Sequence, residues 1–446
     1  MINKNRFFAR TLCTAAFMAA VVTAFFSCSS AEQPPACRAD MRPFPAPYSA
    51  MLAICSDIDG TTPEEFETYH RFLNTDDATP WGRGLGLDIA DSMFFYMASD
   101  QPGAADNQGR DNAAVMTFFI GTSDQYKNGG LIAYYCEVGW IDAMHSYGDF
   151  SMVDESKTVF TRGLAEKAVE EMAARGMVVT VWINHGNRSN VQNLERRAKN
   201  GKGSYRKGGD LGSEYYHADM TIPAGVKFVW FSNEDGNFGA DTPLYPAELE
   251  DGQKVWGFNR YTGKHTRTVS EYYWSVFFMH KQLTAEHLDS IVQKNQFAIV
   301  AQHLGGSTYY YPLTDEAVES LRLLAQYQQN GDILVARTSR LLEYARVRDR
   351  VQYERIQDGD SVVINITAID DPQLGMDITP ALDSLRGLTF YVPDARAAAI
   401  TVNGQALDES ELVRYEGRNG EGDSIGVKWF EPDVRNFTYG GASFYH

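Results

Sequence analysis

The chain has 446 residues, about three times the length of a typical domain, so it is long enough for two or three domains. Hydrophobic residues make up 44% and charged residues 22% of the sequence, a globular composition that excludes a largely disordered or collagen-like chain. Acidic residues exceed basic ones by 58 to 40, which gives a formal net charge of −18. Phosphate groups would repel this charge, so we expect no binding to nucleic acid and no electrostatic docking onto anionic lipids.

The first 27 residues have the order of a secretory signal peptide. Three basic residues precede an apolar run from Thr14 to Phe26, and Ser27 and Cys28 follow it. A cationic start before an apolar run is typical of a secretion signal, and a small residue directly before a cysteine resembles the lipobox of bacterial lipoproteins. We therefore expect a lipid anchor on Cys28, a tether over residues 28–47, and a location outside the cytoplasm on the bacterial outer membrane or cell surface. An ordinary signal peptide or an uncleaved anchor are the alternatives.

The remaining cysteines do not form a disulfide framework. Cys37, Cys55 and Cys136 are an odd number, widely spaced and without a CxxC pair, whereas small disulfide-stabilised domains use dense, paired cysteines. Cys55 and Cys136 both lie in apolar runs, which favours buried, hydrophobic roles. A single disulfide is left open.

Residues 48–349 alternate short apolar runs with longer amphipathic ones, the pattern of strands followed by helices. Because seven or eight such units follow one another, we predict a distorted (β/α)7-8 barrel of parallel strands rather than an open sheet. The expected strands are 50–56, 92–97, 115–120, 140–144, 177–183, 226–231, 297–301 and 333–336. The expected helices are 158–175, 284–294, 314–329 and 339–350, two of which begin with a capping threonine before acidic residues.

The pattern changes after about residue 350, where only strand-like runs follow. They lie at 361–367, 388–392, 399–402 and 426–430, bounded by Gly, Pro, Asn and Asp. Asn403-Gly404 is a strong signal for a β-hairpin. We predict a separate C-terminal β-sandwich domain over residues 350–446.

Acidic side chains and a histidine follow two of the expected barrel strands. Active sites of such barrels lie at the carboxyl ends of the strands. Asp57 and Asp59 end the first strand, and the two-residue period of a strand puts them on one side. His145 and Asp149 follow the strand 140–144, and with Asp59 they offer one nitrogen and two carboxylates, a set that suits a catalytic zinc or similar divalent ion. An Asp-Gly turn that caps a helix near Pro63, and an ordinary loop histidine, are the alternatives.

Two further histidines follow later strands. His185, in Trp182-Ile183-Asn184-His185, is interpreted as orienting substrate together with Trp182 and Asn184, as a metal ligand, or as a loop histidine bonded to backbone. His303 ends the strand 297–301 and suits a general acid or base, because imidazole titrates near working pH; a buried core histidine is the alternative. Tyr309 lies shortly after His303, and its ring suits stacking on a sugar.

This ordered set of motifs resembles the polysaccharide deacetylase family of carbohydrate esterases and its wider superfamily of glycoside hydrolase and deacetylase barrels. The resemblance rests on Ser56-Asp57-Ile58-Asp59-Gly60, His145-Ser146-Tyr147-Gly148-Asp149 and Gln302-His303-Leu304, and it covers about residues 48–346. In that family a first motif that ends in two acids and a glycine supplies a catalytic base and a metal ligand, a second motif supplies two ligands, and a late histidine is the general acid.

Carried onto this sequence, the resemblance implies Asp57 as the base, His303 as the general acid, and Asp59, His145 and Asp149 as ligands of a divalent metal, which the resemblance implies is zinc. Three departures are visible. Ile58 separates the two acids, so which of them is the base stays open. Asp149 replaces the second histidine, which keeps a ligand that suits zinc. No Arg-x-Pro motif stands near Asn184, so the usual support of the base must come from elsewhere or be missing.

The expected function is metal-dependent removal of acetyl groups from an extracellular glycan, in which a glycan is the partner and the membrane is reached through the lipid anchor alone. A glycoside hydrolase on the same barrel is the second hypothesis, with Asp57 or Asp59 paired with Asp142 across the scissile bond and no metal. A glycan-binding surface lipoprotein without catalysis is the third.

Overall fold

The computed structural model describes residues 39–101, 103–106, 109, 112–196, 204–232, 234–263, 273–306, 312–417 and 421–431. The predicted signal peptide and the lipidation site Cys28 lie outside these ranges. Within them, no helix is both long enough and apolar enough to cross a membrane. Cys55 and Cys136 are both free thiols, and Cys55 is buried as predicted; burial raises the pKa of its thiol to about 12.

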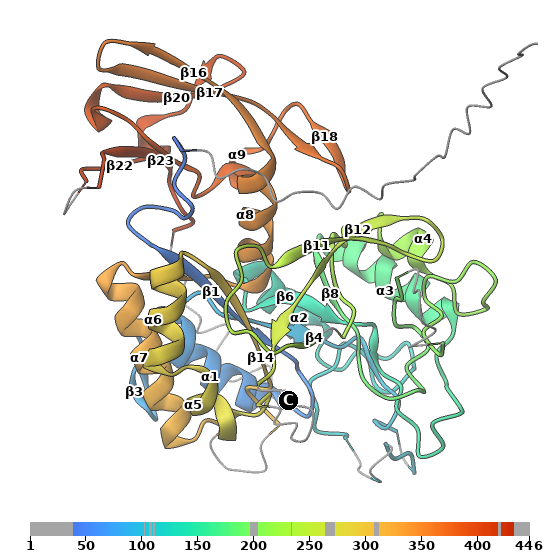
Figure 1. Cartoon of the computed structure of the whole chain (residues 1–446). Helices are drawn as coiled ribbons and strands as arrows, with labels where there is room; N and C mark the ends of the chain where they lie inside the picture. Colours follow the sequence, from blue (N-terminus) through green and yellow to red (C-terminus); the bar gives the residue numbers. More distant parts are fainter. Residues whose placement is uncertain are drawn as a thin grey trace, which may run out of the picture. The chain divides into compact units, whose positions relative to one another are not determined.

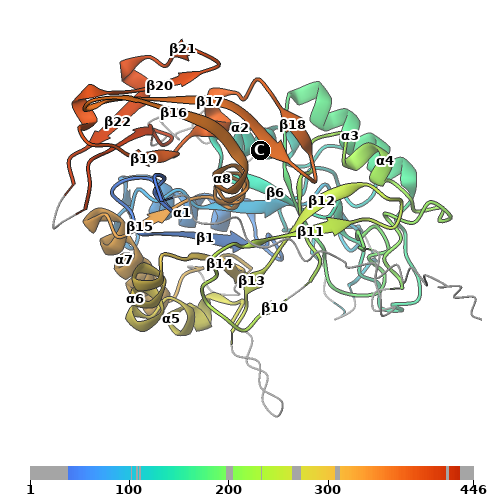
Figure 2. The ribbon, with the colours of Figure 1, turned by 45° about the horizontal axis from the view of Figure 1, so that its top comes forward.

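An eleven-stranded sheet forms the larger part of the structure (Figures 1 and 2). Its strands follow the order β10-β13-β14-β1-β4-β6-β8-β9-β12-β11, with β15 added beside β1. Every pairing is parallel except that of β11 with β12. The strands are β1 (Ala50–Ser56), β4 (Ala90–Met93), β6 (Ile141–His145), β8 (Val181–Ile183), β9 (Phe228–Trp230), β10 (Glu234–Asp235), β11 (Leu244–Glu248), β12 (Lys254–Phe258), β13 (Arg260–Tyr261), β14 (Phe297–Gln302) and β15 (Ile333–Val335).

The sheet curls until its two sides almost meet. Ala240, shortly before the edge strand β11, forms an antiparallel bridge with Phe297 at the start of β14. Both hydrogen bonds of this bridge have a length of 2.9 Å. The prediction of an α/β fold with a barrel-like parallel sheet is therefore confirmed at this level. Ladder pairing among the described residues does not close the ring, because only this single bridge joins its sides.

All four expected helices are present, and the described residues form five further α-helices. Together they are α1 (Pro63–Asn74), α2 (Gly129–Val138), α3 (Arg162–Arg175), α4 (Ala218–Thr221), α5 (Met279–Gln282), α6 (Ala285–Lys294), α7 (Asp315–Asn330), α8 (Thr338–Arg350) and α9 (Leu382–Leu385). Thr284 and Thr314 cap α6 and α7 through their side chains, as predicted. The helix near Pro63 is α1, which Thr62 and Glu65 begin with a capping box.

One expected strand is wrong. Residues 115–120 form turns and a single bridge between Phe119 and Tyr126 rather than a strand. Except for Ile120, their apolar side chains are nevertheless buried, for example Phe118 against Phe95 at a centroid distance of 5.0 Å. Burial alone gives such a run the appearance of a core strand, and sequence periodicity cannot separate the two cases.

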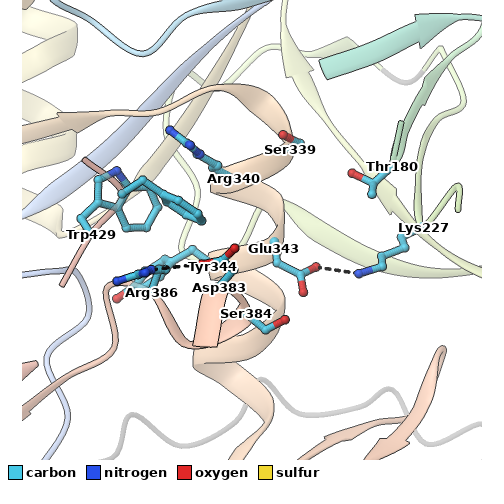
Figure 3. A pocket seen from close by; sticks show the side chains of 11 residues that line it. Thr180, Lys227, Ser339, Arg340, Glu343, Tyr344, Asp383, Ser384, Arg386 and Trp429 are labelled. Carbon is cyan, nitrogen blue, oxygen red and sulfur yellow. Dashed lines mark hydrogen bonds and ion pairs between the residues drawn. The ribbon is translucent and has the colours of Figure 1, made fainter. Parts of the chain in front are cut away.

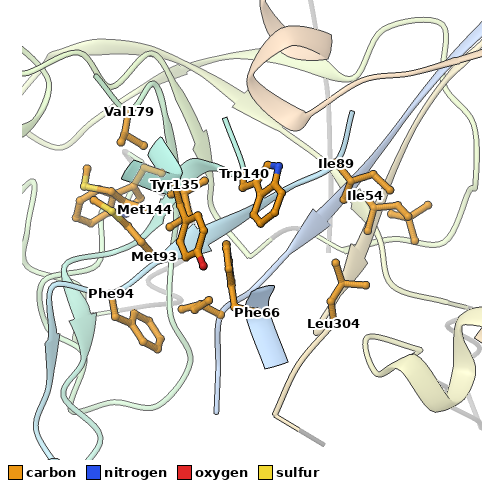
Figure 4. Packing of buried hydrophobic residues seen from close by; sticks show 14 of the residues in the cluster. Ile54, Phe66, Ile89, Met93, Phe94, Tyr135, Trp140, Met144, Val179 and Leu304 are labelled. Carbon is orange, nitrogen blue, oxygen red and sulfur yellow. The ribbon is translucent and has the colours of Figure 1, made fainter. Parts of the chain in front are cut away.

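The strand β1 separates two hydrophobic cores because its side chains alternate between the faces of the sheet. Leu52 and Ile54 face a core that includes Phe66 of α1, Tyr135 of α2 and, just after α2, Trp140. Figure 4 shows part of this cluster, with Ile54, Phe66, Tyr135 and Trp140 among its labelled side chains. A strand that is buried on both faces reads as a continuous apolar run, which is why β1 was predictable.

The opposite face of β1 packs against α8 and the C-terminal strands. Met51, Ala53 and Cys55 share one buried cluster with Leu341 of α8 and Ile364 of the C-terminal part. In both ribbon views α8 lies between the large sheet and the C-terminal strands (Figures 1 and 2). It then continues directly into β16, since the helix ends at residue 350 and the strand begins at 351. The division predicted at residue 350 thus falls inside a shared core and not in a linker.

The C-terminal part contains two small sheets, one in the order β16-β17-β20-β21 with β18 beside β17, and one in the order β19-β23-β22. The predicted hairpin at Asn403-Gly404 is confirmed, because both residues have positive φ angles and join β20 to β21. Sandwich packing itself stays a prediction. The strands are β16 (Val351–Asp358), β17 (Ser361–Asp371), β18 (Gly375–Asp377), β19 (Thr389–Tyr391), β20 (Ala398–Val402), β21 (Gln405–Ala406), β22 (Leu412–Tyr415) and β23 (Ser424–Val427). The two-residue strands β2 (Ala78–Thr79), β3 (Gly82–Arg83), β5 (Tyr96–Met97) and β7 (Gly148–Asp149) lie in loops of the larger part.

Residues 39–47 of the expected tether belong to this shared core. Met41 bridges to Phe390 of β19, and the Phe44 ring is fully buried and packs edge-on against Phe297 with centroids 4.8 Å apart. A buried ionic contact adds to the same junction, because Asp371 of β17 accepts hydrogen bonds from Trp256 and Arg346. The start of the described chain thus joins the barrel-like sheet to the C-terminal strands.

Candidate metal centre

The carboxyl ends of neighbouring parallel strands bring the predicted site residues together. Asp57 and Asp59 follow β1, His145 ends β6, His185 follows β8, and His303 follows β14. In the sheet these strands stand in the order β14-β1-β4-β6-β8. The amide of Asp57 continues the ladder by donating to Gln302 O at 2.9 Å, so the first acidic loop and the loop of His303 leave the sheet side by side.

Asp59 is the centre of the cluster because imidazole nitrogens face both of its carboxylate oxygens. His185 Nε2 lies 2.7 Å from Oδ1, while His303 Nε2 and His145 Nε2 lie 3.5 and 3.7 Å from Oδ2. The rings of His145 and His185 stand nearly perpendicular, with centroids 4.6 Å apart. Phe94 packs edge-on against both rings and fixes their positions from the apolar side.

Asp57 is held by a buried arginine that sequence reasoning missed. Arg260 of β13 donates two hydrogen bonds to the Asp57 carboxylate, at 2.7 and 3.1 Å, and its guanidinium lies 3.7 Å from the ring centroid of Trp230. Burial by itself would raise the pKa of Asp57, but Arg260 and then His145 hold that pKa well below its ordinary value. The carboxylate is therefore ionised at neutral pH. The sequence signal was an arginine that interrupts the apolar run 255–261.

The donor set fits a divalent cation. One oxygen or nitrogen from each of Asp59, His145 and His185 lies within 4.8 Å of the others, and the same holds for Asp57, Asp59 and His303. Two ligand atoms about 2.0–2.1 Å from one tetrahedral zinc ion are about 3.4 Å apart, close to the separations measured around Asp59. Asp59 Oδ2 is buried and makes no hydrogen bond to any described residue. An uncompensated buried carboxylate oxygen is costly, and a cation would satisfy it.

The surrounding carboxylates raise the pKa of two of the histidines. Burial lowers the pKa of His185, but Asp149 and Asp59 outweigh it and raise that pKa to about 10. Burial likewise opposes protonation of His303, and its contact with Asp59 raises the pKa to about 9. His303 Nδ1 lies 2.7 Å from Trp274 O, so this nitrogen donates to the carbonyl and Nε2 faces Asp59. Without a cation, protonated imidazoles balance the negative charge of the cluster.

Asp149 lies behind His185 and outside both ligand groups. Its Oδ1 is 3.7 Å from His185 Nδ1, the nitrogen on the far side of the ring from Asp59. Ser151 N donates to the same oxygen at 2.8 Å. The structure thus brings His185, and not Asp149, together with Asp59 and His145, while Asp149 lies against the far side of the His185 ring. The loop that follows His145 turns Asp149 away, since Gly148 and Asp149 pair as β7 with β5.

The other predicted substrate-binding residues have different surroundings. Trp182 is fully buried, and its indole N–H donates to Asn184 Oδ1 at 2.9 Å. Asn184 in turn exchanges two hydrogen bonds with the backbone of Leu194. These residues hold the loop after β8 and offer no surface to a ligand, because side chains so deeply buried and mutually bonded cannot be reached from solvent. Tyr309 lies outside the described residues.

Close backbone contact between the loops that follow β1 and β14 depends on a glycine. Gly306 has a φ of +72°, and a Cβ atom there would lie 2.4 Å from the Asp59 carbonyl oxygen. We expect Gly306→Ala to push Asp59 out of line and to lower metal affinity and turnover by about 10- to 100-fold, since small misplacements of reacting groups cost that much. Gly359→Ala is the matched control: its φ is +61° but no atom lies within 4 Å of the added carbon. Equal metal affinity in the two variants, measured by calorimetry, would contradict this role.

A recess lies at the other end of the strands (Figure 3). It has a volume of about 240 Å³ and is lined in part by Thr180, which precedes β8, and by Lys227, which precedes β9. Its charged groups neutralise one another, as in the pairs Lys227–Glu343 and Arg386–Asp383. This recess brings together no histidine and no unpaired acid, so the cluster around Asp59 is the better candidate for chemistry.

Comparison with known proteins gives no further guide to this site. No family model matches the chain, and no curated protein matches it.

Proposed function

We propose that the protein is a metal-dependent hydrolase that removes acetyl groups from a glycan, on a barrel of the polysaccharide deacetylase type. The single observation that carries this proposal is the Asp59 carboxylate enclosed by three imidazoles, beside an Asp57 carboxylate that Arg260 holds ionised. One cluster thus contains both the residues that could hold a metal and two residues, Asp57 and His303, that could transfer protons. No other cluster among the described residues combines three histidines with two carboxylates.

Asp59, His145 and His185 would hold the metal, because the two imidazoles and the carboxylate supply the nitrogen and oxygen ligands that zinc prefers. When bound, a zinc-type ion supplies Lewis acidity, which polarises an ester or amide carbonyl and makes water more acidic. Asp57 accepts a proton from the attacking water, since it is ionised and adjoins the ligand group. Arg260 keeps Asp57 oriented through both carboxylate oxygens.

His303 donates a proton to the departing hydroxyl or amine. Its Nδ1 bonds to Trp274 O, which leaves Nε2 directed toward the cluster, the position from which a protonated ring donates. The side chains of His303 and Asp59 are 27% and 32% exposed, whereas that of His145 is 5% exposed. A substrate would therefore reach the cluster from the side of His303.

The position of Asp142 weakens the alternative hypothesis of a metal-independent glycoside hydrolase. Asp142 Oδ2 accepts the backbone N–H of Ser339 at 2.7 Å and so caps the start of α8. Burial raises the pKa of Asp142 to about 6, but Asp142 belongs to neither group of candidate ligands. The anchoring of the protein to the cell envelope through a lipid on Cys28 stays part of the proposal, and loss of fatty-acid labelling in Cys28→Ala would test it.

The proposal predicts that metal binding and acetate release both depend on His145. We expect the purified protein to hold about one divalent ion, and His145→Ala to lose both the ion and acetate release from acetylated glycans. His303→Ala should keep the ion and slow acetate release by about 10² to 10⁴, the usual scale for a positioned general acid. Metal content would be measured by elemental analysis and acetate by an enzymatic assay.

His287→Ala is the matched control. His287 lies in α6, stacks on Phe238 at a centroid distance of 4.6 Å and bonds to Gln282 O, and it belongs to neither group of candidate ligands. It should keep both metal and turnover. A protein that holds no metal, yet keeps its activity in His145→Ala, would contradict the deacetylase mechanism. Bound metal without turnover of any acetylated glycan would favour a binding protein.

A further inference from the structure

His185 presents one ring nitrogen to Asp59 and the other to a buried network of polar side chains. Its Nδ1 lies 3.0 Å from the carbonyl oxygen of Gly186 and 3.1 Å from the side-chain nitrogen of Asn190. Asn190 itself has no exposed surface. A histidine can ligate a metal through Nε2 only when the proton is on Nδ1, so the partners of Nδ1 decide whether the ring is ready to bind.

The orientation of the Asn190 amide is fixed by its neighbours. Its oxygen accepts hydrogen bonds from the backbone N–H of Phe150, at 2.8 Å, and from Gln192 Nε2, at 3.1 Å. Two donors identify this atom as the oxygen, so the NH₂ group must face the other way. That group donates to Gly186 O at 2.5 Å and lies 3.2 Å from the hydroxyl of Ser151. Asn190 thus ties the loop after β8 to the segment 150–151.

This arrangement accommodates both neutral forms of the His185 ring. With the proton on Nδ1, the ring donates to Gly186 O and leaves the Nε2 lone pair toward Asp59 and His145. With the proton on Nε2, the ring donates to Asp59 and Nδ1 accepts from the Asn190 amide. Either form keeps the ring in one place, because the two partners of Nδ1 are joined to each other.

A second amide links this network to the loop of the other histidine. Gln192 Nε2 donates to Ser146 Oγ at 2.8 Å and to Gly148 O at 3.0 Å, directly after His145. The backbone of Gln192 accepts from His217 Nε2 at 2.7 Å. The loops that carry the two imidazole ligands are therefore joined through Gln192 and Asn190, whose side chains are both fully buried.

We propose that Asn190 is the positioning residue that holds the His185 ring so that its Nε2 can ligate a divalent cation. The proposal rests on the metal site of the proposed function but not on the reaction that the site performs. Asn190 acts through His185 and touches neither Asp59 nor the cation. Histidine ligands depend on such second contacts, whose removal typically weakens metal binding by 10- to 100-fold.

The test measures zinc affinity by competition with a chelator, together with the visible absorption spectrum of the cobalt-loaded protein. Asn190→Ala should weaken zinc binding by about 10- to 100-fold and change the cobalt spectrum, which reports ligand geometry. Asn74→Ala is the matched control, because it also removes a side-chain amide that donates to a backbone carbonyl, Ile89 O at 2.6 Å, away from the site. It should leave affinity and spectrum unchanged.

Asn190→Asp keeps the shape of the side chain and the oxygen that Phe150 and Gln192 require, so it guards against a failure of the alanine variant to fold. Its zinc affinity should fall between those of the natural chain and Asn190→Ala. If a folded Asn190 variant has the zinc affinity and the cobalt spectrum of the natural chain, the proposed role of Asn190 is wrong, and the metal site itself is unaffected. A natural chain that binds neither ion would overturn this proposal and the metal site together, while metal binding without acetate release would contradict the proposed reaction and leave the role of Asn190 standing.

Discussion

A chain that ends at Arg350 should fail to fold, although it contains the whole curled sheet and all of the candidate metal centre. Removing the C-terminal strands takes away one side of the hydrophobic cluster around α8, in which Phe228, Trp256 and Leu341 are almost completely buried. Each large apolar side chain returned to water costs about 1.5–3 kcal/mol. A few of them exceed the whole stability of a typical domain, about 5–15 kcal/mol.

The truncated chain and the full chain would be compared by soluble yield and by circular dichroism. We expect the truncated chain to be insoluble or to lack a cooperative thermal transition. Phe390→Ala in the full chain is a milder test of the same core, since Phe390 is fully buried in β19 beneath Tyr353. It should cost about 3–5 kcal/mol and keep the fold. A soluble fragment that ends at 350 with a native-like spectrum would show that the two parts are independent domains.

The sequence predicted the strands whose burial is uniform and failed where long-range contacts decide. The run Ala50–Ser56 and the run Phe297–Gln302 are buried along their whole length, and both were found within a residue or two. The equally apolar segment 115–120 forms no strand, because nothing in a local pattern tells whether a neighbouring strand is available to pair. The antiparallel pair β11 and β12 was missed, because β11 is only partly buried and the buried run of β12 is only four residues long.

The domain boundary at residue 350 stays a prediction, although residues on its two sides share one hydrophobic cluster. A change from βα patterning to strands alone is visible in the sequence, and it coincides with the end of α8 and the start of β16. Whether two parts share a core depends on which side chains face the junction. Ile364 and Phe390 look like the core of any small β domain, yet they share their cluster with the central strand β1.

The candidate site was predictable in its members but not in its contacts. Asp57, Asp59, His145 and His303 were expected from their places after strands, and the structure brings all of them together. The family motif favoured Asp149 as a ligand, whereas His185 lies against Asp59 instead. Loop conformation decides between them: the backbone and amide bonds around Asn190 and Gln192 fix the loop after β8, and such bonds leave no periodic signal in a sequence.

Arg260 is the clearest case of a residue that only the fold reveals. It lies 203 positions from Asp57 in sequence, and it reaches Asp57 because β13 pairs with β14, which pairs with β1. The guanidinium is 2% exposed, so the pair is a buried ion pair. In such pairs the loss of one partner is more costly than the loss of both, because the remaining charge stays buried and uncompensated.

Arg260→Met should therefore destabilise the protein by about 3–5 kcal/mol at pH 7, measured by chemical denaturation. The double variant Asp57→Asn/Arg260→Met should recover most of that loss, because no buried charge remains. Arg83→Met is the control for removing an arginine from an ion pair, since both Arg83 and its partner Asp76 are largely exposed. We expect it to cost at most about 1 kcal/mol.

The loss of stability caused by Arg260→Met should also become smaller as the pH is lowered. In the natural chain the folded pKa of Asp57 lies below the value of about 3.9 expected for an unfolded Asp. Asp57 thus contributes stability that is present above about pH 4 and is lost as the pH falls toward the folded pKa. Without Arg260, burial should raise the folded pKa above the unfolded value, so the ionised carboxylate becomes unfavourable at neutral pH. The difference between the two proteins should narrow from pH 7 to pH 3, and a difference that stays constant over this range would show that Arg260 acts through packing on Trp230 and not through the charge of Asp57.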